Sequence, residues 1–286
     1  MTSRRRRLDS ELVRRGMAAS RGEAVRLIEE RRVTVGGAPA HKPARLVQAG
    51  DAVQVSGDPP RYVSRGGQKL EAALAGFGID PSGCRAIDIG ASTGGFTDCL
   101  LQHGAAAVAA VDVGRNQLHE RLRADPRVVS LERTDVRGLE AAAAGGPAEL
   151  VVADVSFISS RLIAVDLCRL ATADMVVLVK PQFEAGKAEA DRGRGVIRDP
   201  AVWRRALVEV CRAVVDAGAA IMGVMVSPVT GAEGNVEFLL HARVGAGAGG
   251  QTDFGEVVDA AVAQAIEVQA IEVQAIEVQA IEVRRD

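Results

Sequence analysis

In this chain, one apolar run after another ends at a charged residue. Asp88, Asp112, Asp154 and Lys180 each follow directly on small and branched apolar residues, Asp135 follows a further run, and Glu237 opens the last one. A charged side chain that ends a buried strand is poorly placed for a core and well placed for a crevice. Because parallel strands bring their carboxyl ends to one edge of a sheet, these residues predict a single polar site there rather than unrelated surface charges.

A glycine-rich segment predicts a loop that binds a nucleoside ligand. It consists of Asp88, Ile89, Gly90, Ala91, Ser92, Thr93, Gly94, Gly95 and Phe96. Gly90 allows backbone angles that a side chain forbids, and Gly94 and Gly95 are expected to leave room for a ligand beside the backbone. The spacing differs from the G-x-G-x-x-G of a nicotinamide dehydrogenase. Asp112 can accept both hydroxyls of a ribose, so a nucleoside ligand is favoured over the alternative of an ordinary tight turn.

The composition indicates an α/β protein of the cytoplasm. Its 286 residues suffice for one large or two modest domains, and aromatic residues make up only 3% of them. Abundant Ala, Val, Leu and Ile suit a parallel sheet flanked by helices. No apolar core follows the basic residues 4–7, and the apolar run 217–226 is too short to span a bilayer, so we expect no secretion signal and no membrane anchor. Four cysteines without a C-x-x-C pair are expected to be reduced and mostly buried: Cys84, Cys99, Cys168 and Cys211.

The charges divide the chain into a basic part and an acidic part. Residues 1–70 carry 15 Lys and Arg against 7 Asp and Glu, whereas the remainder carries 20 against 30. The formal net charge of −2 hides this asymmetry, which indicates two modules. The basic module is expected to contact nucleic acid, with a merely solvated N-terminus as the alternative.

The basic module predicts a small RNA-binding domain. Residues 8–15 and 21–30 are predicted helices, the second with Ser20 as N-cap and Glu23 as its capping-box partner. Strands are predicted at 33–35 and 51–55. This order resembles the alpha-L motif of a small-subunit ribosomal protein, which implies contacts with phosphates and RNA shape. The candidate RNA-binding residues of the chain are Arg4, Arg6, Arg14, Arg15, Arg21, Arg26, Arg65 and Arg133.

After a break at residues 57–60, the second module alternates strands with helices. A helix is predicted from Gln68 to about Gly76. Strands are predicted near 85–90, 107–113, 127–132, 149–155, 174–180, 218–226 and 235–242, and helices at 95–103, 115–123, 159–170 and 199–216. This alternation predicts a doubly wound, largely parallel, Rossmann-like α/β sheet.

The C-terminal segment repeats the five residues Ala-Ile-Glu-Val-Gln from Ala265 to Val283. A five-residue period fits neither the stripe of an amphipathic helix nor the alternation of a strand. We expect a helix to run from about Phe254 and then to give way to a poorly packed or disordered tail. Repeat expansion in the coding sequence is the simplest origin of this segment.

Four residues far apart in the sequence match the Lys-Asp-Lys-Glu set of the FtsJ-like RNA 2′-O-methyltransferases: Lys69, Asp154, Lys180 and Glu237. The glycine-rich loop matches their S-adenosylmethionine motif, and the basic domain ahead of it resembles the TlyA family, often labelled haemolysins. The stretches 64–70, 154–159 and 227–237 are also similar to that family, and the resemblance covers residues 4–262. Tyr62 stands where the family has tryptophan, and the pentapeptide tail has no counterpart there.

The resemblance implies a class I methyltransferase fold, S-adenosylmethionine as cofactor and no metal. Family members methylate a cytidine 2′-hydroxyl of 23S rRNA, and those with a similar arginine-rich start also modify 16S rRNA, so ribosomal subunits are implied partners. The implied cofactor-binding residues are Asp88, Gly90, Ala91, Ser92, Thr93, Gly94, Gly95, Phe96, Asp112, Asp135 and Asp154. The implied organisation is an RNA-binding domain at 1–59, a linker at 60–66, a methyltransferase domain at 67–264 and a repetitive tail at 265–286.

The chemistry of a ribose hydroxyl explains the need for such a set. A 2′-hydroxyl is a weak acid and a poor nucleophile at neutral pH, so its attack on a sulfonium methyl group requires removal of its proton. Lys180 is the candidate base if burial and the second cation, Lys69, favour its neutral form. Asp154 and Glu237 are expected to orient the lysines and hold the hydroxyl, and positioning supplies much of the acceleration. Two ordinary surface ion pairs are the alternative.

Other polar residues and functions stay open. Asn116, Gln117 and His119 are candidates for an adenine pocket or a helix surface, and His103 and His241 for structural roles. Arg192 and Arg194, in the glycine-rich segment 186–195, are candidates for phosphate contacts in a substrate loop or a plain surface loop. The competing functions are a membrane-lysing protein and a catalytically inert ribosome-binding module. The lack of a predicted membrane span argues against the first, and the four-residue set argues against the second.

Overall fold

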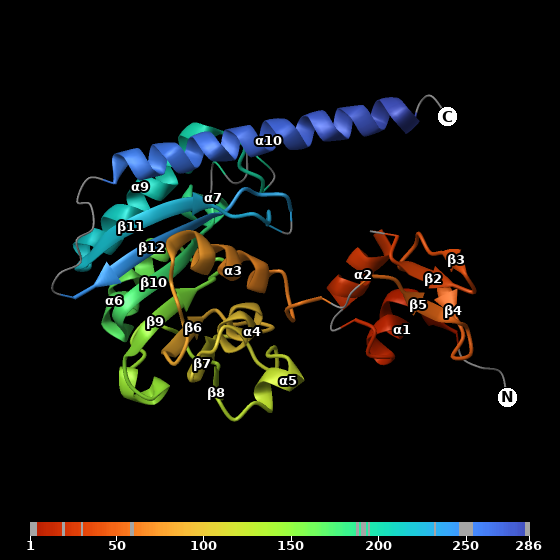
Figure 1. The fold of residues 1–286 in the computed structure, drawn as a ribbon, viewed down its shortest axis with the longest axis horizontal. Helices are drawn as coiled ribbons and strands as arrows, with labels where there is room; N and C mark the ends of the chain where they lie inside the picture. Colours follow the sequence, from red (N-terminus) through yellow and green to blue (C-terminus); the bar gives the residue numbers. More distant parts are fainter. Residues whose placement is uncertain are drawn as a thin grey trace. The chain divides into compact units, whose positions relative to one another are not determined.

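The computed structural model describes residues 5–18, 21–29, 31–57, 60–186, 189, 193, 195–231, 233–245 and 254–283, with side chains as far as residue 271. The chain divides into two compact units, Met1–Val63 and Ser64–Asp286 (Figure 1). Four residues named above lie outside the described residues: the expected N-cap Ser20 and the expected RNA contacts Arg4, Arg192 and Arg194.

In the N-terminal unit, two helices pack against a three-stranded antiparallel sheet in the order β3-β2-β5. The helices are α1 (Leu8–Arg14) and α2 (Arg21–Glu29), and the strands are β2 (Val33–Val35), β3 (Ala38–Pro39) and β5 (Val53–Val55), with β1 (Arg6–Arg7) paired to β4 (Leu46–Val47). Leu12, Ile28 and Val33 are fully buried in its core. The predicted helices and strands are confirmed, whereas β1, β3 and β4 escape sequence prediction because two residues carry no periodic pattern.

The larger unit is built on a seven-stranded sheet in the order β11-β12-β10-β9-β6-β7-β8 (Figure 1). Its strands are β6 (Arg85–Ile89), β7 (Ala107–Asp112), β8 (Val128–Glu132), β9 (Ala148–Ala153), β10 (Ala171–Val179), β11 (Ala219–Val226) and β12 (Phe238–Val244). Neighbours from β10 to β8 run parallel, whereas β12 is antiparallel to both β10 and β11. The Rossmann-like sheet is confirmed. Its antiparallel strand arises because β11 and β12 follow each other without an intervening helix.

Helices flank this sheet and mostly follow the predicted alternation. They are α3 (Gly66–Phe77), α4 (Gly95–Gln102), α5 (Glu120–Arg123), α6 (Ala164–Leu170), α7 (Pro181–Glu184), α9 (Pro200–Asp216) and α10 (Gly255–Val283), with the 3-10 helices η1 (Ala141–Ala144) and η2 (Ser160–Ile163). The helix predicted over 115–123 is wrong in its first half. Asn116 adopts a left-handed φ of 54° in a loop, and the side chain of His119 caps α5 by accepting the amide of Arg121.

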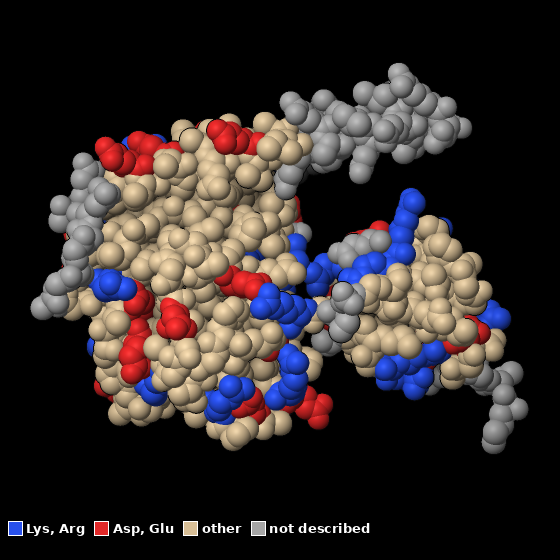
Figure 2. Space-filling model, in the orientation of Figure 1, with Lys and Arg blue, Asp and Glu red and all other residues tan. Residues whose placement is uncertain are grey.

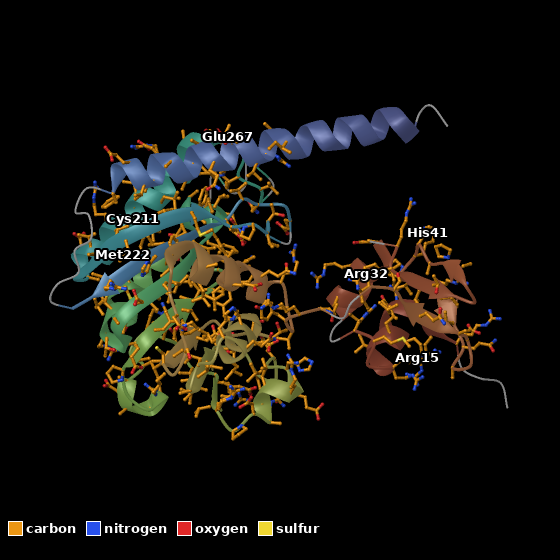
Figure 3. The ribbon with its side chains drawn as sticks, viewed as in Figure 1. Arg15, Arg32, His41, Cys211, Met222 and Glu267 are labelled. Carbon is orange, nitrogen blue, oxygen red and sulfur yellow. The ribbon has the colours of Figure 1, made fainter. Side chains whose placement is uncertain are left out.

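One core cluster of the larger unit lies between the sheet and helices α6, α9 and α10, and apolar residues of α3 and α4 are also buried. Trp203 of α9 is fully buried, donates a hydrogen bond from Nε1 to the carbonyl of Ile197 at 3.0 Å and meets the ring of Phe238 edge-on. Cys211 on the same helix is also fully buried (Figure 3), and burial raises the pKa of its thiol to about 12. All four cysteines are free.

Helix α10 corrects the expectation for the tail. Its first turns pack into the core through Val258, Ala261 and Ala265. The expectation of a disordered tail is wrong, because the backbone stays helical through the repeat to Val283. The repeat contains no Gly or Pro that would end a helix. Its period does rotate the apolar positions around the helix axis, and Ile271 is accordingly exposed.

The turn between β6 and α4 depends on two glycines. Gly90 has a φ of +80°, and a Cβ there would lie 2.4 Å from the carbonyl oxygen of Asp154. Gly94 has a φ of +94°, and its Cβ would lie 2.3 Å from a methyl carbon of Leu122. The expectation that Gly94 leaves room for a ligand is therefore corrected, because a side chain of the protein, Leu122, takes that space. Beside Gly95 the nearest atom to a Cβ would be the Ser64 hydroxyl.

Substitution Gly94→Ala is expected to lower the free energy of unfolding by roughly 1–3 kcal/mol. The new Cβ would clash with Leu122, and the alanine would have to adopt the left-handed φ of this position. Gly78→Ala is the matched control, since Gly78 has a φ of +66° but no atom within 4 Å of a Cβ. Thermal denaturation should show the larger loss of Tm for Gly94→Ala. Equal losses would mean that φ alone, and not packing, requires glycine at position 94.

Candidate active site

The first ion pair of the site joins the ends of β9 and β10. Lys180 Nζ lies 2.5 Å from Asp154 Oδ1 and donates a hydrogen bond to Ser156 Oγ at 2.9 Å. The Lys180 side chain is only 10% exposed, so its charge is compensated in a largely dry environment. β9 and β10 are parallel neighbours, which is why residues that follow each strand meet at one edge.

The second ion pair joins helix α3 to the start of β12. Lys69 and Glu237 form a short, buried salt bridge in which both side chains are less than a tenth exposed. β12 pairs with β10 so that Phe238 lies opposite Val179, and the next position along this antiparallel ladder sets Glu237 beside Lys180. The structure thus brings all four predicted residues to one edge of the sheet and arranges them as two adjacent ion pairs.

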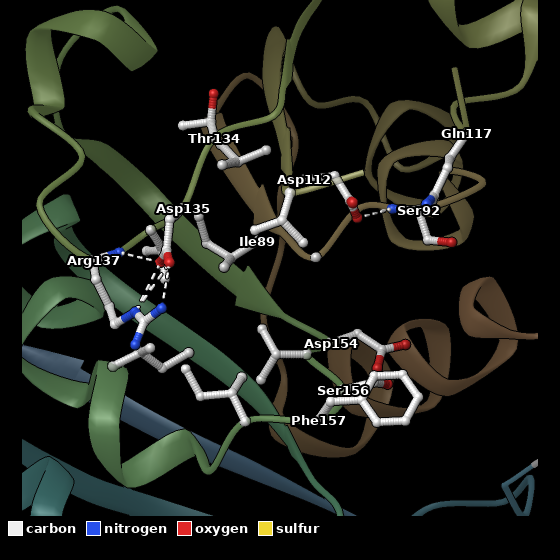
Figure 4. Close-up of a pocket in the computed structure, with 17 residues that line it drawn as sticks. Ile89, Ser92, Asp112, Gln117, Thr134, Asp135, Arg137, Asp154, Ser156 and Phe157 are labelled. Carbon is white, nitrogen blue, oxygen red and sulfur yellow. Dashed lines mark hydrogen bonds and ion pairs between the residues drawn. The ribbon is translucent and has the colours of Figure 1, made fainter. Parts of the chain in front are cut away.

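A cavity of about 460 Å³ opens beside the first ion pair (Figure 4). Asp112 forms part of its wall, where Oδ2 accepts the amide of Ser92 at 2.8 Å and Oδ1 accepts the amide of Gly114 at 2.6 Å. Each carboxylate oxygen keeps a second acceptor position, as binding of two ribose hydroxyls requires. Gln117, one of the candidates for an adenine pocket, also lines this cavity.

Asp135 lies on another wall of the same cavity and is held by Arg137 (Figure 4). The guanidinium of Arg137 donates to both carboxylate oxygens, and the Arg137 amide donates to Oδ1 at 2.9 Å. The hydrogen bonds from Arg137 lower the pKa of the Asp135 carboxyl. Asp135 therefore stays charged and presents acceptors where the cavity meets solvent.

A second, smaller cavity of about 190 Å³ lies under the glycine-rich loop and adjoins the first. Gly90, Ser92, Asp154 and Ser156 line both cavities. The loop residues on its wall are Asp88, Gly90, Ala91, Ser92, Thr93, Gly95 and Phe96, whereas Gly94 is not among them. Lys180 also lines this smaller cavity, and its amine contacts Asp154 and Ser156, which line both cavities.

Asp88 is fully buried in β6 and has an unused acceptor. Its Oδ2 accepts the amide of Thr97 at 2.9 Å and the Thr97 hydroxyl at 2.6 Å, whereas Oδ1 has no hydrogen-bond partner. Burial raises the pKa of this carboxyl to about 7, and the negative charges of Asp154 and Asp112 add to the shift. A buried acceptor on a cavity wall is suited to a cationic ligand group, which would both supply the missing hydrogen bond and favour the ionised carboxylate.

Several residues of the site are absent from the sequence prediction. Ser64 lines the smaller cavity, Arg137 holds Asp135, and Ser156 bonds to Lys180. Phe157 lies on the wall of the larger cavity with its side chain almost wholly exposed and a left-handed φ of 66°. Ser156 and Phe157 stand directly after Asp154 in the sequence, and this adjacency is the one signal that could have identified them.

The predicted histidine roles are resolved by their contacts. His241 is buried against Asp174, with Nε2 2.7 Å from Oδ1, and its ring lies 5.2 Å from the ring of Phe77 at an angle of 37°. His103 Nδ1 lies 2.9 Å from the carbonyl of Cys99 within its own helix turn. Neither lines either cavity.

Buried carboxylates on α1 hold three of the arginines expected to contact RNA. Glu11 pairs with Arg14 at 2.6 Å and Arg15 at 2.8 Å, and these partners lower the pKa of the Glu11 carboxyl to about 2. Asp9 pairs with Arg21, among others, at 3.1 Å. Arg15 also donates to backbone carbonyls of residues 48, 49 and 51 (Figure 3), so its guanidinium is committed to the fold of its own unit.

The remaining arginines of the predicted set differ in exposure. Arg6 is exposed on β1 and Arg26 is half-buried on α2. In the larger unit Arg65 directly precedes α3, and Arg133 is exposed after β8 with a φ of 54°. Figure 2 shows Lys and Arg side chains over several parts of the visible surface of the N-terminal unit. The RNA contacts themselves stay predictions.

None of the described helices combines the length and apolar character needed to cross a bilayer. Among the described residues there is also no group of three or more His, Cys, Asp and Glu side chains that could hold a metal ion. The acidic groups at the sheet edge are matched by lysines and by backbone amides.

Known proteins share both units. Residues 62–244 match the model of the FtsJ-like methyltransferase family, and residues 6–53 match that of the S4 domain. The chain is 50% identical over 244 residues to the 16S/23S rRNA (cytidine-2′-O)-methyltransferase TlyA of Mycobacterium tuberculosis, covering 84% of this chain and 91% of that protein. It is 40% identical over 238 residues to Hemolysin A of Brachyspira hyodysenteriae, covering 82% and 98%. A solved structure of a hemolysin-named protein from Streptococcus thermophilus has a TM-score of 0.76 at 38% identity, covering 94% and 98%.

The raised pKa of Asp88 makes stability depend on pH in a predictable direction. Because the folded state keeps this proton to about pH 7 and the unfolded state loses it near pH 4, the free energy of unfolding should fall as pH rises between these values. Measured against Asp88→Asn, this decrease in the free energy of unfolding is at most about 4 kcal/mol, because a difference of one pKa unit between the folded and unfolded states corresponds to roughly 1.4 kcal/mol. Urea titrations of both proteins from pH 4 to pH 8 measure it. A difference that stays constant with pH would contradict the assignment.

Proposed function

The chain belongs to the FtsJ-like methyltransferases and, within them, to the TlyA family, and from this premise we propose that it transfers a methyl group from S-adenosylmethionine to a cytidine ribose 2′-hydroxyl of 23S and 16S rRNA. The observation that carries the proposal is the position of Lys180. Its amine touches Asp154 and Ser156, the two residues after β9 that line both cavities. A hydroxyl brought beside this amine meets a nitrogen that can take its proton when the lysine is in its neutral form.

The residues present fit S-adenosylmethionine. The unpartnered oxygen of Asp88 is suited to the ammonium of its amino-acid part, Asp112 to its ribose hydroxyls, and Asp135 to a donor on its adenine. The acidic lining also favours a ligand with positive charge. When bound, the cofactor supplies an electrophilic methyl group on a sulfonium.

Lys180 is the proposed base, and its partners set its position. Asp154 and Ser156 both contact the lysine amine and so restrain it beside the cavities that they line. Lys69 of α3 and Glu237, which directly precedes β12, form the second ion pair of the set. Precise placement of the hydroxyl against the methyl group supplies much of the rate.

Phe157 is proposed to meet the base of the target nucleotide. An almost wholly exposed aromatic ring beside a catalytic cavity offers a surface on which an unstacked base can lie. The S4 domain is proposed to hold the RNA backbone through its arginines, with ribosomal subunits as the partner and the cytoplasm as the place of action.

The decisive experiment replaces Lys180 in two ways. Lys180→Ala should abolish methyl transfer while leaving cofactor binding within about threefold, because the cofactor is held mainly by groups other than this amine. Lys180→Arg is the matched variant, since a guanidinium can keep the ion pair with Asp154 but cannot act as a base. Incorporation of labelled methyl into rRNA and calorimetry of cofactor binding measure the two effects. Wild-type-like turnover by Lys180→Arg would refute Lys180 as the base.

Methyl incorporation, rRNA binding and liposome lysis, each measured on the wild-type protein, distinguish the competing functions. Binding of rRNA without methyl incorporation would establish a non-catalytic ribosome-binding module. Lysis of liposomes by nucleotide-free protein would support a membrane-active protein.

Removal of residues 1–60 should weaken binding to ribosomal subunits by at least about tenfold at moderate salt, because the S4 domain contributes phosphate contacts. The dependence of the binding constant on salt should also become less steep. Affinity for the cofactor should not change. Filter binding across a range of salt concentrations tests this, and an unchanged slope would show that the phosphate contacts lie in the larger unit.

A further inference from the structure

Glu184 is a buried carboxylate that the proposed chemistry does not use. It ends helix α7, and its side chain is only 1% exposed. It accepts a short hydrogen bond from the Ser159 hydroxyl and a 2.7 Å hydrogen bond from the amide of Ser160. Arg161 lies 3.5 Å from it and also pairs with Glu209 on α9. A buried carboxylate with this many donors fixes the backbone that supplies them.

These hydrogen bonds connect two segments that carry the proposed site. One is the loop of residues 154–160, and the other is the segment 180–184. At one end Lys180 binds Asp154 and Ser156, and at the other end Glu184 binds the loop. Between them the ring of Phe183 lies 5.3 Å from the ring of Phe157 and 5.9 Å from Lys180 Nζ.

The backbone conformation of Phe157 requires contacts that hold the chain before and after this residue. A left-handed φ of 66° is unfavourable for a residue with a Cβ and persists only where the flanking structure imposes it. The ring is 92% exposed, so burial does not hold it. The anchors are therefore the Lys180 contacts before Phe157 and the Glu184 contacts after it.

We propose that Glu184 is a positioning residue, whose carboxylate clamps the loop of residues 154–160 to α7 and so holds Phe157 and Lys180 in register for the RNA substrate. This inference rests on the proposed function and extends it to the presentation of the acceptor nucleotide. It assigns Glu184 to RNA engagement rather than to the cofactor, because Glu184 lines neither cavity.

The test compares three variants of the full chain. Glu184→Ala should lower kcat/KM for rRNA by about 10- to 100-fold, mainly through KM, as expected for a misplaced substrate contact. Glu184→Gln should recover most of this loss, since its amide oxygen can accept from Ser160 and its amino group can donate to Ser159. Glu209→Ala removes the other carboxylate bound to Arg161 and should behave like the wild type. Cofactor affinity should stay unchanged in all three.

A double-mutant cycle with Phe157→Ala identifies the route of the effect. If Glu184 acts through Phe157, the two losses in kcat/KM are not additive, and Glu184→Ala has little further effect once Phe157 is gone. Additive losses, or an unchanged kcat/KM in folded Glu184→Ala, would overturn the inference. If Glu184→Ala does not fold, Ser159→Ala takes its place in the cycle, since it removes one hydrogen bond of the clamp. Lack of methyl transfer by the wild type would instead reject the proposed function.

Discussion

The ion pair between Lys180 and Asp154 is the interaction on which the site depends. It joins the ends of β9 and β10, two parallel neighbours, and lies beside both cavities, since Asp154 lines both and Lys180 lines the smaller one. A lysine amine in so dry a place requires a carboxylate beside it, and the carboxylate in turn fixes the amine. The loop after β9 and helix α7 start from these two residues, so their positions follow from the same contact.

The site keeps its charges in balance by pairing them locally. Lys69 compensates Glu237, Lys180 compensates Asp154, and Arg137 compensates Asp135. Asp88 differs, because it is buried without a cation and holds its proton to about pH 7. An acidic wall with one incompletely satisfied carboxyl is suited to a cationic nucleoside. The excess of Lys and Arg over Asp and Glu in residues 1–70 is suited to the opposite kind of ligand, a polyanion.

Much of this architecture could be predicted from the sequence, since strand type and order follow from local apolar runs. The strands β6 to β12 and the residues that follow them were identifiable in this way. Other features were not. The position of β12 between β10 and β11 depends on how strands distant in the sequence are ordered in the sheet. The helix expected over 115–123 lost its first half to a side-chain cap and a left-handed residue. The continued helix α10 shows that lack of an apolar stripe does not prevent helix formation when no residue breaks it.

The sequence by itself determined the chemical types at the site, because charged residues that end apolar strands have few other places to lie. It also determined that Lys69, Asp154, Lys180 and Glu237 belong together, through their match to a known set. Only the tertiary structure decided their pairing, since partners such as Lys69 and Glu237 are 168 residues apart and meet because helix α3 packs beside β12. The exposure of Phe157 and the burial of Glu184 were likewise decided there, because burial depends on how distant segments pack and not on the residues themselves.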